Sequence, residues 1–470
     1  MPRTEKDTLG EVAVPDGALY GAQTQRAVEN YPISGLREHP QFIRAFILIK
    51  RAAALANREL GVLDEQRATA IVAACDRILG DFAGHRQHFV VDVFQAGAGT
   101  SFNMNCNEVL ANLANVALGG QLGMYTPVHP NDHVNMAQST NDVFPTALRV
   151  STRFLLDQLL LALDELGLAL DDKGREFADV IKSGRTHLQD AVPVTLGQEF
   201  AAYAAAVRRS TRLLRNVGEE VEELGIGGTA AGTGMNAPVG YRFTVIRHLN
   251  ASTGLQFRPA PDLREAMQSQ LPVVAVSAAL RNLALELTRI TNDLRLLASG
   301  PMTGLAEILL PSVQPGSSIM PGKVNPSMLE CMNQVLFHII GADTAVAYAS
   351  QAGQLELNVM MPLMAFEISF SIEILKNYLP VFVQKCIRGI EANRERCEAY
   401  YISSPSLATA LNPIIGYAAA AEIAKESART GKRIPDMLRE RQLIPEEQIA
   451  AIFTPEFLAG QADREPGEKA

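Results

Sequence analysis

The sequence predicts an all-α fold, a bundle of long helices with a mixed N-terminal domain and a small helical C-terminal domain. Three observations predict it: long stretches with apolar residues at helical spacing, few segments with strand-like alternation, and breaks rich in proline and glycine. A chain of 470 residues has room for roughly three domains of about 150 residues each. We place boundaries near residues 138 and 396, which gives domains 1–138, 139–396 and 397–470.

The helix signal is clearest after Val273. Apolar residues recur there in alternating steps of three and four, the spacing of a helix with one buried seam, at Val276, Leu280, Leu283, Leu287, Ile290, Leu294 and Leu297. Similar spacing predicts helices over 196–224 and 156–170, and further helical stretches near 329–340 and 366–387. Exposed apolar stripes of this length would promote aggregation, so we expect the helices to pack together, with the bundle continued across subunits.

Charge and composition exclude several classes of protein. The net charge of −9, without a basic run, argues against a general nucleic-acid binder. The N-terminal residues 1–7 carry charges with no apolar segment behind them, and the apolar stretch Phe154–Leu170 is interrupted by acids. Five cysteines without C-x-x-C spacing argue against a disulfide framework or a zinc cluster. We therefore expect a cytoplasmic protein that neither spans nor binds a membrane.

Three short motifs imitate known sites and fail on spacing or context. In 316–323 five residues separate the glycines where a phosphate-binding loop has four, and Val324 stands where a magnesium-binding hydroxyl is needed. The stretch 232–237 follows a helix instead of the strand that a dinucleotide site requires. His129 and His133 have the spacing of metal ligands, but Pro130 disfavours the helix that would carry them, and we predict no metal site.

Three polar clusters lie at the breaks between helices. The first is Gly97–Ser101 with nearby asparagines, joined by Gln138–Asp142; the second is Gly184–Asp190; the third is the loop 311–326, in which four prolines forbid regular helix. Each cluster alone has an ordinary explanation as a helix cap or a turn. Together they supply neutral hydrogen-bond donors, one lysine and one histidine, a set suited to holding a small carboxylate and stabilising added charge on it.

These residues resemble the aspartase/fumarase superfamily. Gly316-Ser-Ser-Ile-Met-Pro-Gly-Lys-Val-Asn-Pro326 is similar to its signature, and other landmarks follow in order over almost the whole chain, at Gly97–Glu108, Gln138–Asp142, Gly184–Gln198, Gly227–Asn236 and Asn292–Pro301. The resemblance implies a homotetramer around a central multi-helix bundle. It also implies active sites assembled from three subunits, and a lyase that forms fumarate by anti elimination without an organic cofactor. Activation by a divalent cation is not determined by the sequence.

Within the superfamily the substrate is either aspartate or malate. Gly97–Ser101 and Ser139–Asn141 are similar to aspartases, and these positions would touch substrate. Residues 128–132 are more similar to a secondary dicarboxylate site of fumarases, and residues 119–124 are also more similar to fumarases. The inner positions therefore favour a carbon–nitrogen lyase acting on L-aspartate. Fumarate hydratase, a lyase of an aspartate analogue and a non-catalytic helical scaffold are the alternatives.

The resemblance also implies roles for individual residues. Ser317 would be the catalytic base on a mobile loop, and His187 would be oriented by Glu330. The substrate-binding residues would be Thr100, Ser139, Thr140 and Ser318 around the β-carboxylate; Thr186, Lys323 and Asn325 on the α-carboxylate; and Thr100, Asn141 and His187 near the amino group. Met302 and Met361 depart from the family pattern, in which an arginine and an acid usually stand at these positions.

Overall fold

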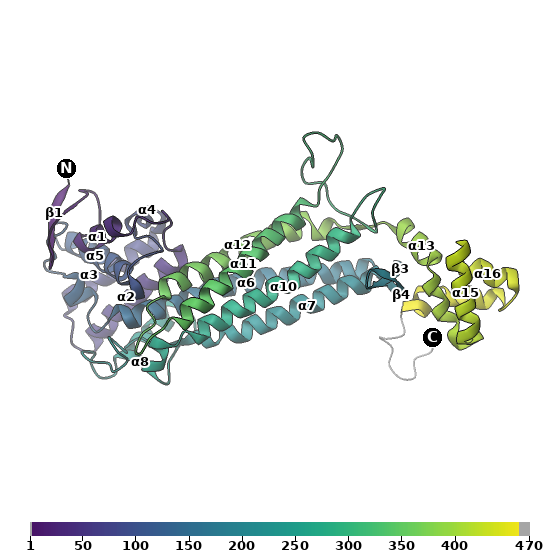
Figure 1. Cartoon of the computed structure of the whole chain (residues 1–470). Helices are drawn as coiled ribbons and strands as arrows, with labels where there is room; N and C mark the ends of the chain where they lie inside the picture. The colour runs from purple at the N-terminus through teal and green to yellow at the C-terminus, as the bar shows by residue number, and fades with distance from the viewer. Residues whose placement is uncertain (1, 460–470) are drawn as a thin grey trace. The chain divides into compact units, whose positions relative to one another are not determined.

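The structure, a computed structural model, describes residues 2–459 and is mostly helical, which confirms the predicted all-α class (Figure 1). The chain forms two compact units. Unit 1 comprises Met1–Leu160, Arg212–Ala284 and Phe337–Lys376, and unit 2 comprises Leu161–Thr211, Leu285–Leu336 and Asn377–Ala470. The division into three domains, with boundaries near residues 138 and 396, stays a prediction.

Five long helices contribute residues to both units. They are α6 (Thr140–Glu176), α7 (Leu196–Gly218), α10 (Leu271–Leu297), α11 (Ser327–Gln351) and α12 (Met361–Lys385). The periodic stretches predicted all of them. The predicted helix over 196–224 extends too far, because four acidic residues follow Gly218 and are unfavourable at the negative end of a helix dipole.

The buried seam of α10 is the one that the sequence predicts. All eight apolar residues from Val273 to Leu297 in that series are buried. Ser277 of α10 donates to Asp343 of α11 at 2.7 Å, and Thr291 donates to Asn333 at 2.5 Å, so the two helices run antiparallel. Among residues 2–459, α10 is the one helix whose length and composition would allow it to cross a membrane, and 39% of that apolar window is buried in the structure.

Besides its parts of the long helices, unit 1 holds the N-terminal elements and four elements from the segment Arg212–Ala284 (Figure 1). They are β1 (Arg3–Asp7), β2 (Gly10–Val14), α1 (Ala22–Asn30), α2 (Pro40–Glu59), α3 (Glu65–Gly80), α4 (Phe82–His85), α5 (Thr100–Ala117), β5 (Glu223–Leu224), α8 (Tyr241–Thr253), β6 (Arg258–Pro259) and α9 (Leu263–Gln268). Its core contains four fully buried phenylalanines with ring centroids 4.9 to 5.8 Å apart, Phe42, Phe46, Phe102 and Phe144. These rings hold α2 against the first turns of α5 and α6.

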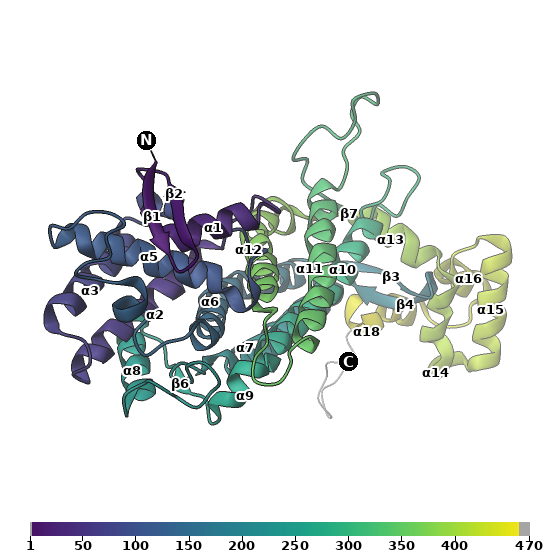
Figure 2. The ribbon, with the colours of Figure 1, turned by 60° about the vertical axis from the view of Figure 1, so that its left-hand side comes forward.

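Unit 2 holds an antiparallel hairpin and a small group of C-terminal helices (Figure 2). Its elements are β3 (Ile181–Thr186), β4 (Gln189–Thr195), β7 (Ile308–Leu309), β8 (Glu391–Ala392), α13 (Arg394–Ser403), α14 (Asn412–Ile415), α15 (Tyr417–Thr430), α16 (Ile434–Arg441), α17 (Glu446–Ile452) and α18 (Pro455–Ala459). The C-terminal helices bury their own apolar cluster, which includes Leu411, Ile434 and Leu438. The loop from 311 to 326 has neither helix nor strand, as its prolines predict.

Candidate active site

A cavity of about 670 Å³ opens in unit 1 where two helices begin. Its walls are the first turn of α5, the loop before α6 with the first turn of α6, and part of the glycine-rich loop 225–236. Four of the predicted substrate-binding residues line it: Thr100, Ser139, Thr140 and Asn141. The structure therefore brings the first polar cluster together in one concave site.

The start of α5 is fixed by a tight glycine turn. Gly99 has a φ of +83°, a conformation that favours glycine, and a Cβ there would lie 2.0 Å from the ring of Phe144. Ala98 also has a positive φ, of 60°, and its N–H donates to Val359 O at 2.8 Å. This turn aims the N-terminus of α5 at the cavity, with Thr100 as the first helical residue, where the helix dipole favours an anion.

The start of α6 is a capped helix end with its hydroxyls in the same cavity. Asn141 N–H donates to Ser139 Oγ at 3.2 Å, and Ser139 N–H donates to Asp142 Oδ1 at 2.9 Å, which is the reciprocal arrangement of a capping box. Asn103 Nδ2 donates to the Thr140 hydroxyl at 3.0 Å. A second helix N-terminus therefore faces the cavity, with its hydroxyl groups held in place.

Asp142 ties the glycine-rich loop to this helix end. Its Oδ2 accepts the N–H groups of Gly227 and Thr229, each at 2.9 Å, while Asn141 Nδ2 donates to Ala230 O at 2.9 Å. Burial raises the pKa of the Asp142 carboxyl to about 6, although the backbone donors oppose the rise. The loop and the α6 terminus therefore form one hydrogen-bonded wall.

Lys50, which the sequence analysis did not identify, lies under this cavity. It is fully buried, and its Nζ donates to Asn135 Oδ1 at 3.0 Å. The same oxygen accepts from Asn103 Nδ2 at 3.2 Å and Asn107 Nδ2 at 3.1 Å. Burial lowers the pKa of the Lys50 ammonium to about 7. Sequence alone gave little signal, because the stretch 42–56 also carries Arg44 and Arg51, which are only partly buried.

The second polar cluster forms the tip of the β3–β4 hairpin in unit 2. Thr186 pairs with Gln189 and leaves a two-residue turn, His187-Leu188, with φ values of 57° and 58°. Such a turn usually takes asparagine and glycine, because each other residue in the left-handed region costs about 1–2 kcal/mol. His187 and Thr186 are exposed in the chain. Strain at a predicted catalytic histidine is typical of a functional position.

The third cluster places Ser317 in a turn of backbone donors. Its Oγ accepts the N–H of Ile319 at 3.2 Å and the N–H of Met320 at 2.9 Å. Two N–H groups aimed at one hydroxyl oxygen would stabilise negative charge on it.

The base of this loop is closed by its own backbone. Gly316 N–H donates to Lys323 O at 2.8 Å, and Asn325 Nδ2 donates to Gly316 O at 2.6 Å. A Cβ at Gly316 would lie 2.5 Å from Lys323 O, so glycine is required there. Lys323 and Ser318 are exposed, while Asn325 is half-buried.

The predicted site residues are therefore divided between the units of one chain. Those of unit 2 are Thr186 and His187 on the hairpin, Ser317, Ser318, Lys323 and Asn325 on the loop, and Glu330 in the first turn of α11. Within residues 2–459, no hydrogen bond or ion pair joins His187 to Glu330 in the chain. The His–Glu pair stays a prediction.

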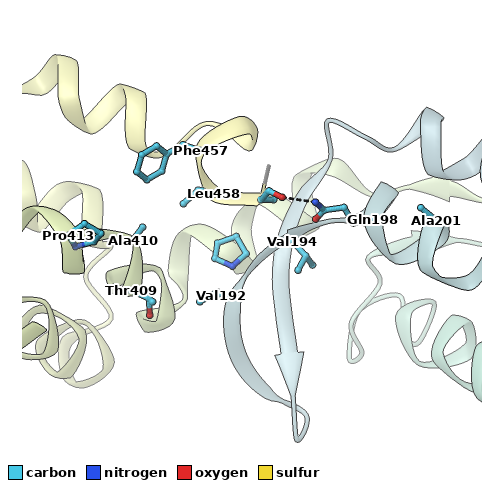
Figure 3. A pocket seen from close by; sticks show the side chains of 11 residues that line it. Val192, Val194, Gln198, Ala201, Thr409, Ala410, Pro413, Phe457 and Leu458 are labelled. Carbon is cyan, nitrogen blue, oxygen red and sulfur yellow. Dashed lines mark hydrogen bonds between the residues drawn. The ribbon is translucent and has the colours of Figure 1, made fainter. Parts of the chain in front are cut away.

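A second cavity, of about 700 Å³, lies in unit 2 between β4 and the C-terminal helices (Figure 3). Its lining is mainly apolar, with Val192, Val194 and Phe457 among its residues, and Gln198 Nε2 donates to Ala459 O at 2.6 Å beside it. None of the predicted site residues lines it.

The two histidines with metal-ligand spacing accept hydrogen bonds from backbone N–H groups. Contrary to the sequence prediction, a short helical turn forms at Pro130–Val134, because proline is tolerated in the first turn of a helix. His133 Nδ1 accepts the N–H of His129 at 2.8 Å, and His129 Nδ1 accepts the N–H of Asp132 at 3.2 Å. The described residues contain no group of three or more His, Cys, Asp or Glu that could hold a metal ion.

Comparison with known proteins identifies the family. Residues 10–341 match the lyase family, and residues 407–460 match the C-terminus of fumarase C. The chain belongs to the aspartase/fumarase superfamily. Two similar curated relatives are both aspartate ammonia-lyases. That of Pseudomonas aeruginosa is 49% identical, over 97% of this chain and 96% of the relative. That of a Bacillus species is 46% identical, over 96% of each.

Solved structures of superfamily members have the same fold. A fumarate lyase:delta crystallin from Brucella melitensis bound to cobalt has a TM-score of 0.93 and 47% identity, covering 96% of this chain and 98% of the other. A class II fumarase from Schistosoma mansoni also has a TM-score of 0.93, at 35% identity, covering 98% of this chain and 100% of the other. The helical-bundle fold predicted from the resemblance is therefore confirmed.

Proposed function

We propose that this chain catalyses the reversible anti elimination of ammonia from L-aspartate to give fumarate. Full-length identity carries the proposal: it is 46–49% to aspartate ammonia-lyases and 35% to a fumarase. The inner residues Thr100 and Ser139–Asn141 agree with it, since their sequence is similar to aspartases and they line one cavity.

Removal of the Cβ proton is the difficult step. It places a second negative charge on the adjacent β-carboxylate, so donors must already be aimed at those oxygens, and each is worth about 3 kcal/mol. The unit 1 cavity supplies three hydroxyl groups, Thr100, Ser139 and Thr140, at two helix N-termini. We assign this cavity to the β-carboxylate, with Ser318 completing the shell.

Ser317 is assigned as the base. A serine hydroxyl is a poor base at neutral pH unless its alkoxide is stabilised. The N–H groups of Ile319 and Met320 already point at its oxygen, and Lys323 from the same loop adds a positive charge when the loop closes over substrate. Thr186, Lys323 and Asn325 hold the α-carboxylate in this assignment.

The amino group lies near Asn141, Thr100 and His187 in the same assignment. Asn141 has its amide nitrogen committed to Ala230 O, which leaves its side-chain oxygen to accept from the ammonium. His187 lies at a strained hairpin tip, with Glu330 as its orienting partner in this assignment.

Assembly into a homotetramer would bring the unit 1 cavity of one chain to the hairpin and loop of others. The single chain leaves large apolar side chains exposed on three of the long helices: Leu285, Leu296, Phe337, Tyr348 and Phe370. Exposed apolar rows of this kind are typical of subunit interfaces. We infer a tetramer with sites shared among three subunits, in the cytoplasm, without an organic cofactor.

Fumarate hydratase is the second candidate. The fumarase-like stretches 119–124 and 128–132 favour it, and residues 131 and 132 line the unit 1 cavity. The departures from the family pattern lie elsewhere: Met302 is 83% exposed in a loop, and Met361 is fully buried at the start of α12. Met361 therefore packs in the core where the family usually has an acid, and the exposed Met302 is accessible for contact with another subunit.

The deciding experiment supplies purified protein with L-aspartate or L-malate and follows the ultraviolet absorbance of fumarate. Release of fumarate and ammonia from aspartate, at a rate well above that from malate, is the expected result. Faster turnover of malate would assign a fumarase. Activity on a substituted aspartate alone would assign a lyase of an analogue, and no turnover of any of these would indicate a structural scaffold.

A further inference from the structure

Outside the assigned site, a cluster of four charged side chains, two of them buried, lies behind the hairpin tip. It consists of Lys182 and Arg185 on β3, Glu199 on α7, and Glu307 just before β7. The two positive and two negative charges balance. The Glu307 carboxylate has no exposed surface, and the Lys182 side chain has 2%. A buried ion-pair cluster adds little to stability compared with apolar packing, so its presence calls for another role.

A bulge in β4, opposite Gly184, lies beside this cluster. Residues three apart on a regular strand point to opposite faces, which would separate Lys182 from Arg185. The pairing shifts between Ser183 and Arg185, where residues 191 and 192 of β4 lie opposite Gly184 alone, and both cations reach the Glu307 carboxylate. Gly184 permits the bulge, because a Cβ there would lie 2.5 Å from Val192 O on the partner strand.

Glu307 contacts Arg185 through both of its carboxylate oxygens. Arg185 Nη1 donates to Glu307 Oε2 at 3.0 Å, and Nη2 lies 2.9 Å from Oε1 as a second ion-pair contact that lacks hydrogen-bond geometry. The guanidinium carbon also lies 5.5 Å from the ring centre of Tyr400. Two contacts restrain the orientation of a guanidinium as well as its position.

The backbone of Glu307 is itself anchored. Its N–H donates to Leu297 O, at the end of α10, at 2.9 Å, and its carbonyl accepts the N–H of Asn393, the cap of α13, also at 2.9 Å. The backbone of the residue whose carboxylate contacts Arg185 is therefore fixed by hydrogen bonds on both sides. Arg185 directly precedes Thr186 and His187, so any rotation at this position moves the tip.

We propose that Glu307 is a positioning residue that, through Arg185, holds the strained tip so that Thr186 and His187 face the substrate. The proposal rests on the proposed function for the roles of Thr186 and His187. It gives this cluster of neutral total charge a role: the hydrogen bond and the second ion-pair contact to Arg185 restrain a turn whose own backbone is strained. Loss of the contact should therefore affect catalysis more than folding.

The test compares variants of the full-length enzyme. Glu307→Gln keeps the shape of the side chain but removes its charge. Arg185→Lys keeps the charge but lacks the guanidinium that makes both contacts. Arg185→Met/Glu307→Met removes the pair together, a change that usually leaves folding intact. Glu199→Gln is the matched control, because Glu199 contacts Lys182 at 2.7 Å in the same cluster and, among the described residues, forms no ion pair with Arg185.

Four quantities are measured on each variant: kcat for aspartate, KM for aspartate, the thermal unfolding midpoint, and hydrogen exchange of the peptide covering 182–195. We expect kcat to fall roughly 100-fold in the Glu307 and Arg185 variants, the loss that a displacement of about 1 Å can cause. Exchange at 186–189 should be faster in them. Glu199→Gln should keep kcat within about threefold of the wild-type value and keep the exchange of the tip.

The results separate the two proposals. Wild-type protein that does not turn over aspartate overturns the proposed function, while the exchange data still decide whether Glu307 holds the tip. Normal kcat in the double-methionine variant, with or without faster exchange, overturns the positioning role. Equal losses of kcat in Glu307→Gln and Glu199→Gln would also overturn it, since general damage to the cluster would then explain the effect.

Discussion

Gly99→Ala tests whether the tight turn before α5 positions the unit 1 cavity. An alanine there carries two costs. The φ of +83° costs an L-residue about 1–2 kcal/mol. The added Cβ would lie 2.0 Å from the ring of Phe144, which is fully buried among Phe42, Phe46 and Phe102, and overpacking of this kind costs about 1–3 kcal/mol more. The total is about 2–5 kcal/mol.

Gly119→Ala is the matched control for the backbone term. Gly119 follows the other end of α5 with a φ of +84°, and a Cβ added there would have no atom within 4 Å. It should lose only about 1–2 kcal/mol. Urea unfolding of both variants measures the difference, which isolates the clash with Phe144.

Activity gives the second readout of Gly99→Ala. Relief of the clash must move either the first turn of α5 or the first turn of α6, which carry Thr100 and Thr140. We therefore expect kcat/KM for aspartate to fall about 100-fold, while Gly119→Ala keeps nearly normal activity. Equal losses of stability in the two variants, together with normal activity of Gly99→Ala, would refute the packing argument.

Three further predictions follow from the site. Ser317→Ala should lower kcat roughly 1,000-fold with little change in the affinity for a dicarboxylate inhibitor. Lys323→Ala should lower both kcat and the affinity for the inhibitor. Near-normal turnover by Ser317→Ala would contradict its role as the base and would make His187 the next candidate. Inactive Ser317→Ala and inactive Thr100→Ala proteins, dissociated and reassembled together, should regain part of the activity, because the sites are shared; hetero-tetramers without activity would contradict this. Lys50→Met tests the buried lysine. The pKa of Lys50 is about 7 in the folded protein and 10.5 in its ordinary state, so the unfolded chain binds more protons between these values and the stability of the wild type rises with pH there. The unfolding free energy of the wild type relative to Lys50→Met should therefore rise by about 1 kcal/mol per unit between pH 7 and 9, and a constant difference would contradict the lowered pKa.

The sequence by itself determined the elements whose signal is local. The steps of three and four between apolar residues predicted α10 and its buried seam, and the prolines of 311–326 predicted a loop without helix. The motif order over almost the whole chain identified the superfamily, which the full-length identities to aspartate ammonia-lyases confirm. These features depend on neighbours in sequence, so the sequence records them directly.

Only the tertiary structure decided what lies behind the predicted site residues. Lys50 and Asn135 are 85 positions apart in the chain, and Arg185 and Glu307 are 122 apart, so no local pattern links the partners. The Gly99 turn is required because the ring of Phe144 closes over it, and Lys182 and Arg185 come together because both contact the buried Glu307. Contacts of this kind depend on how helices pack and strands register, and packing free energy is set by all the partners together.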